Sequence, residues 1–115
     1  MIQKTDADFA WEKTAQLLAI DSPSGFTDRA AAWVRGEFEK LGFSAFVTAK
    51  GGVLADLGGS DGQDALLLEA HADTLGGMVA QIKSSGCLKL TNLGGMNANN
   101  AETENVRVYT RSGKV

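Results

Sequence analysis

The sequence predicts an α/β fold that is organised around one short apolar stretch. Two stretches with helical spacing, near residues 6–19 and 27–41, come first, and short segments with alternating character follow them. Residues 65–68, Ala-Leu-Leu-Leu, are then bounded on both sides by glycine-containing turns. Such a run is too short for a helix and predicts a central strand that is buried on both faces.

The first helical stretch is indicated by apolar residues that recur on one face. Trp11, Ala15 and Leu18 stand at positions i, i+4 and i+7, and Thr5 or Asp6 can cap the first turn. We therefore expect Trp11 to lie in the core. Residues 21–25, Asp-Ser-Pro-Ser-Gly, break the helical pattern, and their composition predicts a plain connection between two helices.

The second helical stretch has clear signals at both of its ends. Thr27 is a suitable N-terminal cap, and Gly42 can adopt the left-handed conformation that ends many helices. Apolar residues recur between them on one predicted face, namely Ala30, Val34, Phe38 and Leu41. This face should pack against the sheet.

Alternating residues predict two hairpins and one further strand. Residues 43–48 and 53–57 flank a glycine turn, which is typical of a β-hairpin. Residues 78–83 and 87–91 flank a Ser-Ser-Gly turn and predict a second hairpin. Residues 106–111 have the composition of another strand.

The predicted secondary structure changes from helical to all-β after the central stretch, which indicates two modules. A helical part followed by an all-β part predicts a first module over residues 1–76 and a second over residues 77–115. Residues 105–115 predict a strand, a Ser-Gly turn and the start of a return strand. Because a half-built hairpin leaves a sheet edge open, we expect the chain to be the N-terminal piece of a longer protein.

Composition excludes several classes of partner. A hydrophobic content of 43% and a charged content of 22% are those of a soluble globular protein. The net charge of −3 and the lack of a basic cluster argue against nucleic acid. No apolar run approaches the roughly 20 residues of a membrane span, and the first residues lack a secretory signal. The single cysteine suits a reducing compartment, so a cytoplasmic location is expected.

The candidate functional residues follow the predicted central strand. His71 is the only histidine of the chain, and Asp73 stands two residues after it. In an open α/β sheet, chemistry collects beyond the carboxyl ends of the strands. An imidazole there can bind a metal through one ring nitrogen while a carboxylate holds the other. The same pair can also be an ordinary hydrogen-bonded contact, because His-x-Asp is a weak pattern by itself.

Several stretches together resemble the M42 family of metallo-aminopeptidases, of the glutamyl aminopeptidase and tetrahedral aminopeptidase type. The resemblance covers nearly the whole chain in order. It is carried by Ser-Pro-Ser-Gly at 22–25, Lys-Gly-Gly-Val-Leu-Ala at 50–55, Glu-Ala-His-Ala-Asp-Thr-Leu-Gly at 69–76, Leu-Gly-Gly at 93–95 and Val-Arg-Val-Tyr-Thr-Arg-Ser-Gly-Lys-Val at 106–115. Most members are expected to have Glu at the position of Thr74, which puts the substrate preference in question more than the metal site.

The resemblance implies a fold, a reaction and a role for each candidate residue. It implies the first part of a co-catalytic zinc-peptidase domain that runs into the start of an inserted β-barrel. It also implies two divalent ions, zinc or cobalt, which activate a water for the hydrolysis of N-terminal residues from peptides. His71 would be a metal ligand and Asp73 the acid that orients it. The remaining ligands and the general base would lie in later sequence, so the chain alone is expected to be inactive. The complete protein is expected to be a homo-oligomer.

Two alternatives remain open from the sequence. One is a related metal-dependent exopeptidase or deacylase of the wider co-catalytic zinc group, in which His-x-Asp recurs. A β-barrel that begins directly after this motif favours the M42 type over that group. The other is a non-catalytic binding or assembly module that uses its β-segment as an interface. Further Asp, Glu-Glu and His ligands downstream would favour an enzyme.

Overall fold

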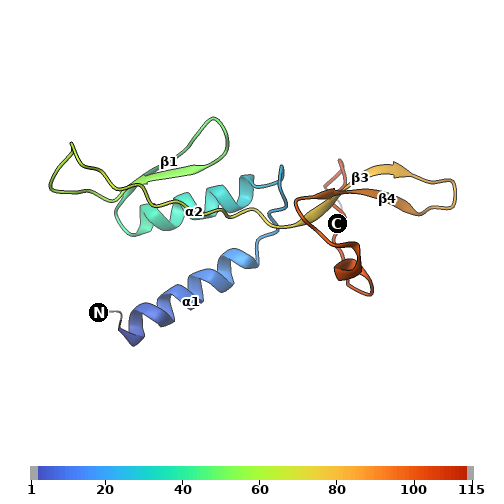
Figure 1. Ribbon diagram of the computed structural model, residues 1–115, viewed down its shortest axis with the longest axis horizontal. Helices are drawn as coiled ribbons and strands as arrows, with labels where there is room; N and C mark the ends of the chain where they lie inside the picture. Colours follow the sequence, from blue (N-terminus) through green and yellow to red (C-terminus); the bar gives the residue numbers. More distant parts are fainter. Residues whose placement is uncertain (1–2, 114–115) are drawn as a thin grey trace.

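The computed structural model describes residues 3–113 as an elongated arrangement of two helices and two hairpins (Figure 1). The molecule measures 62 × 34 × 25 Å, and its radius of gyration is 18.2 Å. A compact domain of about 100 residues has a radius of gyration of about 13 Å. The chain is therefore extended, with its helices at one end and the second hairpin at the other.

The first helix, α1 (Lys4–Leu18), begins two residues earlier than the sequence predicts. Its N-terminal cap is Gln3, whose backbone N–H donates to the Asp6 carboxylate at 2.9 Å. The prediction that Thr5 or Asp6 is the cap is therefore wrong, although Asp6 does stabilise the first turn. A carboxylate three residues into a helix can accept the amide of the capping residue.

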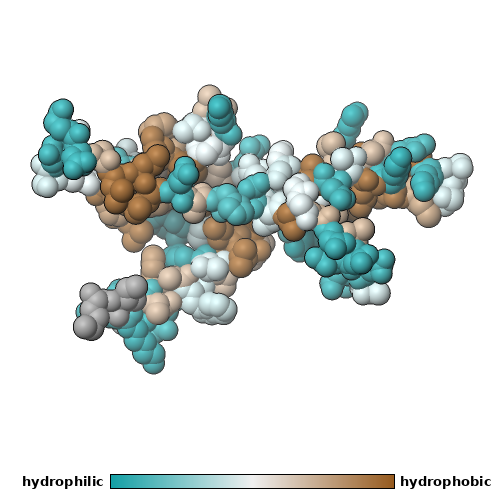
Figure 2. Space-filling view, in the orientation of Figure 1, coloured by the Kyte–Doolittle hydropathy of each residue, from teal (hydrophilic) through white to brown (hydrophobic). Residues whose placement is uncertain are grey.

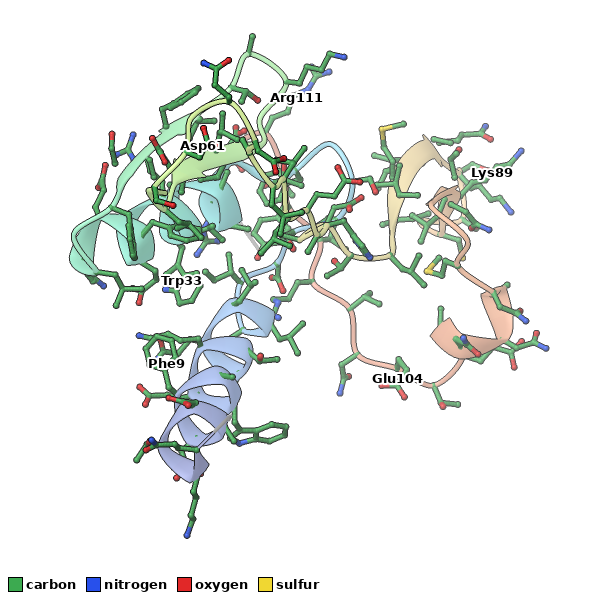
Figure 3. The ribbon with its side chains drawn as sticks, turned by 60° about the vertical axis from the view of Figure 1, so that its left-hand side comes forward. Phe9, Trp33, Asp61, Lys89, Glu104 and Arg111 are labelled. Carbon is green, nitrogen blue, oxygen red and sulfur yellow. The ribbon has the colours of Figure 1, made fainter. Side chains whose placement is uncertain are left out.

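The prediction that Trp11 lies in the core is also wrong. Its side chain is 77% exposed, because among the described elements α1 contacts only α2 (Asp28–Lys40). Lys13 Nζ lies 2.7 Å from Glu37 Oε2 and ties the two helices together by a polar contact. Figure 3 shows α1 standing apart from the rest of the chain. The apolar face that the spacing indicates has no layer to cover it.

Helix α2 and the first hairpin form the best-packed part of the molecule. Strands β1 (Ser44–Val47) and β2 (Val53–Asp56) pair antiparallel, with Phe46 opposite Leu54, and both contact α2. Ala30 and Ala31 of α2 are the buried apolar residues of the described chain. The predictions of this helix and this hairpin are confirmed.

Gly42 ends helix α2 in the manner that the sequence predicts. Its φ of +88° is the left-handed conformation that residues with a side chain rarely adopt. Thr27 is the N-terminal cap residue, but its side chain makes no capping hydrogen bond. The face predicted for this helix includes the buried Ala30, whereas Leu41 at the end of the helix is 55% exposed.

The central strand predicted at residues 65–68 does not form. These residues belong to no sheet, and Leu66, Leu67 and Leu68 are 84%, 70% and 76% exposed. A strand requires neighbouring backbone to accept and donate its hydrogen bonds. No described segment lies in register beside this run, so its apolar side chains remain in solvent. In Figure 1 the stretch runs as plain coil between the two ends of the molecule.

The second hairpin is formed by β3 (Gly76–Ile82) and β4 (Leu88–Leu93), which pair antiparallel with an irregularity between Val79 and Gln81. Both strands are longer than the sequence predicts, but the hairpin itself is confirmed. A short 3-10 helix, η1 (Ala98–Ala101), follows. The strand predicted at 106–111 is wrong, because this segment joins no strand ladder.

The described chain buries few residues and leaves many apolar side chains in solvent. Besides Ala30 and Ala31, only Ser22 is buried among residues 3–113. Figure 2 shows apolar surface over the β1–β2 hairpin, where Phe46 and Leu54 are 56% and 45% exposed. None of the helices within residues 3–113 is long and apolar enough to cross a lipid bilayer. The side chain of the buried Ser22 makes a hydrogen bond to a residue 50 positions later in the chain.

Candidate functional site

The segment that carries the candidate residues is held by the loop between α1 and α2. Pro23 and Thr74 form a parallel β-bridge. The Thr74 N–H donates to Ser22 O at 2.8 Å, and the Ser24 N–H donates to Thr74 O at 3.3 Å. Two stretches about 50 residues apart in sequence are thereby fixed side by side.

Two serine side chains add to this bridge. Ser22 Oγ donates to Ala72 O at 2.9 Å, and Ser24 Oγ donates to Asp73 Oδ2 at 2.6 Å. Ser22 is 1% exposed. The prediction that residues 21–25 are a plain connection between helices is therefore wrong. Sequence reasoning missed both serines as site residues, although Ser-Pro-Ser-Gly is among the motifs that carry the resemblance.

Gly76 explains how closely the two stretches approach. A Cβ placed on Gly76 would lie 2.6 Å from Pro23 Cβ, which is closer than two carbon atoms can come without displacement. The residue two positions after the bridge must therefore lack a side chain if Pro23 is to stay in place. Gly76, the last residue of the motif at 69–76, thus permits the contact with Pro23 that holds this motif in place.

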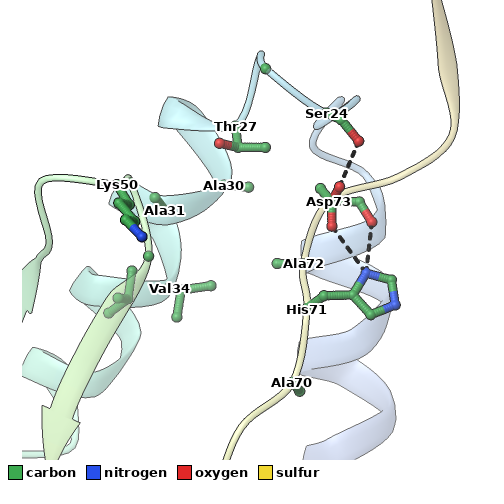
Figure 4. A pocket seen from close by; sticks show the side chains of 14 residues that line it. Ser24, Thr27, Ala30, Ala31, Val34, Lys50, Ala70, His71, Ala72 and Asp73 are labelled. Carbon is green, nitrogen blue, oxygen red and sulfur yellow. Dashed lines mark hydrogen bonds and ion pairs between the residues drawn. The ribbon is translucent and has the colours of Figure 1, made fainter. Parts of the chain in front are cut away.

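His71 and Asp73 lie together, as the sequence predicts. His71 Nδ1 is 3.1 Å from Asp73 Oδ1 and 3.1 Å from the Asp73 backbone oxygen (Figure 4). Because both partners of Nδ1 are acceptors, Nδ1 carries the proton in the neutral ring and Nε2 keeps a lone pair. The His71 side chain is 86% exposed, so this lone pair faces solvent. Proteins orient a metal-binding histidine by such a contact.

The Asp73 carboxylate is kept ionised by its neighbours. The hydrogen bond from the Ser24 hydroxyl lowers the pKa of Asp73, and the contact with the His71 ring lowers it further. Each of these contacts favours the charged form of the carboxylate. At neutral pH the ring of His71 therefore lies beside a full negative charge.

A pocket of about 390 Å³ lies beside this segment. It is lined by the start of α2, by the turn before β2 and by residues 70–73. Ala72 points toward α2, whereas the His71 ring projects from the opposite side of the segment (Figure 4). Successive side chains of an extended segment point to opposite sides. The imidazole nitrogen Nε2 is thus presented away from Lys50 and α2.

A second polar cluster joins the same loop to the C-terminal part of the chain. Arg107 Nη2 lies 2.6 Å from Asp21 Oδ1, and the Tyr109 hydroxyl donates to Asp21 Oδ2. The rings of Phe26 and Tyr109 are 4.9 Å apart. The segment predicted as a strand at 106–111 is therefore docked on this loop through its side chains.

The charges of this cluster shift the pKa values of its members. The hydrogen bonds from Tyr109 and then from Arg107 lower the pKa of Asp21. The hydrogen bond to the same carboxylate raises the pKa of the Tyr109 phenol, and desolvation of the phenol and then the negative charge of Asp21 raise it further. Asp21 directly precedes Ser22, so the cluster lies at the base of the loop that holds the site.

The candidate site fits one ligand of a metal centre rather than a whole one. Nowhere in residues 3–113 do three or more His, Cys, Asp or Glu side chains gather so that they could hold a metal ion. His71 offers the ring nitrogen Nε2 to a metal, because its other ring nitrogen, Nδ1, contacts Asp73. Zinc sites in proteins use three or four protein ligands. The described chain therefore supplies one oriented donor and its supporting carboxylate.

The described chain is an α/β arrangement in which one exposed histidine is oriented by a carboxylate. Residues 51–115 match the family model of the M42 glutamyl aminopeptidases, and the chain belongs to this family. The resemblance seen in the sequence is thereby confirmed.

Two curated relatives are similar over most of the chain. YhfE of Bacillus subtilis (strain 168), a protein provisionally named as an aminopeptidase, is 36% identical over 104 residues. The glutamyl aminopeptidase of Lactococcus lactis subsp. cremoris (strain MG1363) is 26% identical over 105 residues. Each match covers 90% of this chain but 30% of the relative. The chain thus spans about a third of the length of the curated relatives that it matches.

Proposed function

We propose that this chain provides the His71 ligand and its supporting residues to the two-metal site of an aminopeptidase that removes N-terminal residues from peptides. The observation that carries this proposal is the contact of His71 Nδ1 with the Asp73 carboxylate, which leaves Nε2 free to bind a metal. Membership of the M42 family and the names of both relatives support a peptidase.

The two residues have separate roles in this proposal. His71 binds one of two divalent ions, zinc or cobalt, through Nε2. Asp73 does not touch the metal; its carboxylate holds the ring in one tautomer and increases the basicity of the ligating nitrogen. When bound, the two ions would supply an activated water for attack on the first peptide carbonyl.

The departure at Thr74 concerns the substrate rather than the metal site. Thr74 contributes its backbone N–H and carbonyl to the bridge with the Ser22–Ser24 loop. The side chain at this position is therefore free to differ without loss of the bridge. We propose that the replacement of the expected Glu by Thr74 changes which peptides are accepted.

We further propose that residues 1–76 and 77–115 belong to different modules of the enzyme. The first is the start of the catalytic α/β domain, and the second is the start of an inserted β-barrel, to which β3 and β4 would belong. The complete enzyme would be a cytoplasmic homo-oligomer. Because His71 is the only histidine of the 115 residues, these residues alone should not hydrolyse peptides.

The experiment uses a chimera with the Bacillus subtilis relative. The segment of YhfE that matches this chain is replaced by the corresponding residues of this chain, and release of the N-terminal residue from short peptides is measured with zinc or cobalt present. The chimera should be active, and the 115-residue chain alone should not be.

Variants of the chimera test the two roles. His71→Ala should remove most of the activity and lower the bound metal, as measured by mass spectrometry. Asp73→Asn should lower the activity by about 10–100-fold and keep much of the metal, because it removes only the supporting carboxylate. An active chimera that is indifferent to His71→Ala would show that the proposed ligand is wrong. Inactivity of a folded chimera that binds metal would favour a non-catalytic module.

A further inference from the structure

We propose that Ser24 is a positioning residue for His71. Its hydroxyl fixes the plane of the Asp73 carboxylate, and this carboxylate, together with the Asp73 backbone oxygen, keeps the His71 ring protonated on Nδ1 with Nε2 presented. The importance of this hydrogen-bonded arrangement for catalysis rests on the proposed function. The geometric claim itself concerns only the side chains of this chain.

The two oxygens of the Asp73 carboxylate have different partners. Oδ2 accepts from Ser24 Oγ at 2.6 Å, whereas Oδ1 lies 3.1 Å from His71 Nδ1. The last torsion of an aspartate side chain is broad and has no strong preference of its own. A contact on each oxygen therefore determines the plane of the carboxylate, and the shorter of the two comes from Ser24.

Packing cannot replace these hydrogen bonds. The His71 side chain is 86% exposed, so few neighbours restrict the ring, whereas the Asp73 side chain is 42% exposed. The orientation of the ring thus depends mainly on its polar contacts with Asp73. If the hydroxyl of Ser24 is removed, His71 remains as the side-chain partner of the carboxylate. The carboxylate can then rotate, either together with the His71 ring or so that its contact with the ring is lost.

Ser24 is itself held in place by backbone contacts. Its N–H donates to Thr74 O at 3.3 Å, and the Phe26 N–H donates to Pro23 O at 2.7 Å, which closes a turn around it. Pro23 has a fixed φ and forms the bridge with Thr74. The hydroxyl therefore approaches Asp73 from a rigid loop 49 residues earlier in the sequence.

Ser22 provides a matched control within the same loop. Its hydroxyl also donates across to the site segment, but to the backbone oxygen of Ala72 and not to the carboxylate. Removal of either hydroxyl takes away one hydrogen bond between the same two stretches. A purely structural role for Ser24 would therefore give Ser22→Ala and Ser24→Ala the same effect on His71.

The experiment measures the tautomer of His71 in the whole chain by long-range ¹H–¹⁵N correlation spectra at about pH 8.5, where an ordinary imidazole is neutral. Because the chain has one histidine, its ring signals need no further assignment. The Nδ1–H form should dominate in the wild type, in Ser22→Ala and in Ser24→Thr, which keeps a hydroxyl. Ser24→Ala should lower the ratio of Nδ1–H to Nε2–H by about tenfold, as expected for one lost hydrogen bond to a charged group.

The result that would overturn the proposal is a Ser24→Ala spectrum like that of the wild type, or an equal shift in Ser22→Ala. Zn²⁺ alone is then titrated into the same samples to separate this inference from the proposed function. A shift of the Nε2 signal with Zn²⁺, weaker by about tenfold in Ser24→Ala, would support both. A tautomer shift in Ser24→Ala without any response of Nε2 to Zn²⁺ would support the positioning role and show that one oriented imidazole is not enough to bind the metal in this chain.

Discussion

Two neighbouring stretches of this chain have opposite fates. Residues 65–68 are strongly apolar, yet they join no sheet and remain exposed. Residues 72–74 are small or polar, yet they are held by three backbone or side-chain contacts to Ser22 and Ser24, with a fourth to the Asp73 carboxylate. Apolar character alone does not order a segment; it needs backbone or side chains beside it.

The difference also shows how the candidate site is ordered without a core. The Ser22–Ser24 loop satisfies the hydrogen-bonding groups of residues 72–74 directly, and Ser22 is the most buried polar residue of the described chain. Local polar pairing can fix a segment wherever donors and acceptors match.

The largest effect is expected from Gly76→Ala. The added Cβ would lie 2.6 Å from Pro23 Cβ, so the bridge must move or break. Crowding of this kind typically costs about 1–3 kcal/mol. Hydrogen exchange of the Thr74 and Ser24 amides should become faster. Gly59→Ala is the control, because a Cβ at Gly59 meets nothing within 4 Å. Unchanged protection of Thr74 in Gly76→Ala would mean that the bridge tolerates a side chain.

An intermediate effect is expected from Asp21→Asn, which tests whether the base of the loop is held by the C-terminal segment. The Asp21 carboxylate raises the pKa of the Tyr109 phenol. Loss of its charge should return that pKa toward the ordinary value of about 10. Tyr109 is the only tyrosine, so the absorbance of tyrosinate reports it directly. A pKa that does not fall would show that Tyr109 is not bound to Asp21.

The contact of Asp21 with Arg107 and Tyr109 should make the stability of the chain depend on pH in the acidic range. The pKa of Asp21 is lower in the folded chain than its ordinary value, so its contribution to stability is present above about pH 3.9. That contribution is lost as the pH falls through the lowered pKa of the folded state. The ring signals of Tyr109 in proton spectra should change over this acidic range and not between pH 5 and 8. Asp21→Asn should remove the change.

The smallest effect is expected in the apolar run itself. Leu67→Ser should change the free energy of unfolding by less than about 0.5 kcal/mol, because Leu67 is 70% exposed and joins no sheet. Chemical denaturation of this variant and of the wild type measures the difference. A loss of several kcal/mol would indicate that the run is paired in solution, as the sequence alone predicts.

Signals that act over a few residues predicted the structure well. Gly42 ends α2, the glycine turns at 51 and 86 join the hairpins, and His71 contacts Asp73 two residues later. Each of these features depends on backbone conformation or on near neighbours. The spacing of the residues is sufficient to identify them.

Features that depend on distant partners were missed. The roles of Ser22 and Ser24 arise from hydrogen bonds that span 50 and 49 residues. The failed strands at 65–68 and 106–111 have suitable compositions but no ladder partner among the described residues. Trp11 has the spacing of a core residue, but α1 lacks a covering layer. The composition of a segment indicates that it favours burial or strand pairing. It does not indicate whether the fold supplies a neighbouring strand or a covering layer.

The contact of Asp21 with Arg107 and Tyr109 has a consequence for the order of events during synthesis. It closes over 86 and 88 residues, whereas the contacts of Ser22 and Ser24 need the chain only as far as Thr74. A ribosome that adds about 5–20 residues each second takes roughly 2–7 s to make the 35 residues from Thr74 to Tyr109. The loop can thus join the site segment first, and the arginine and tyrosine later lock an arrangement that already exists.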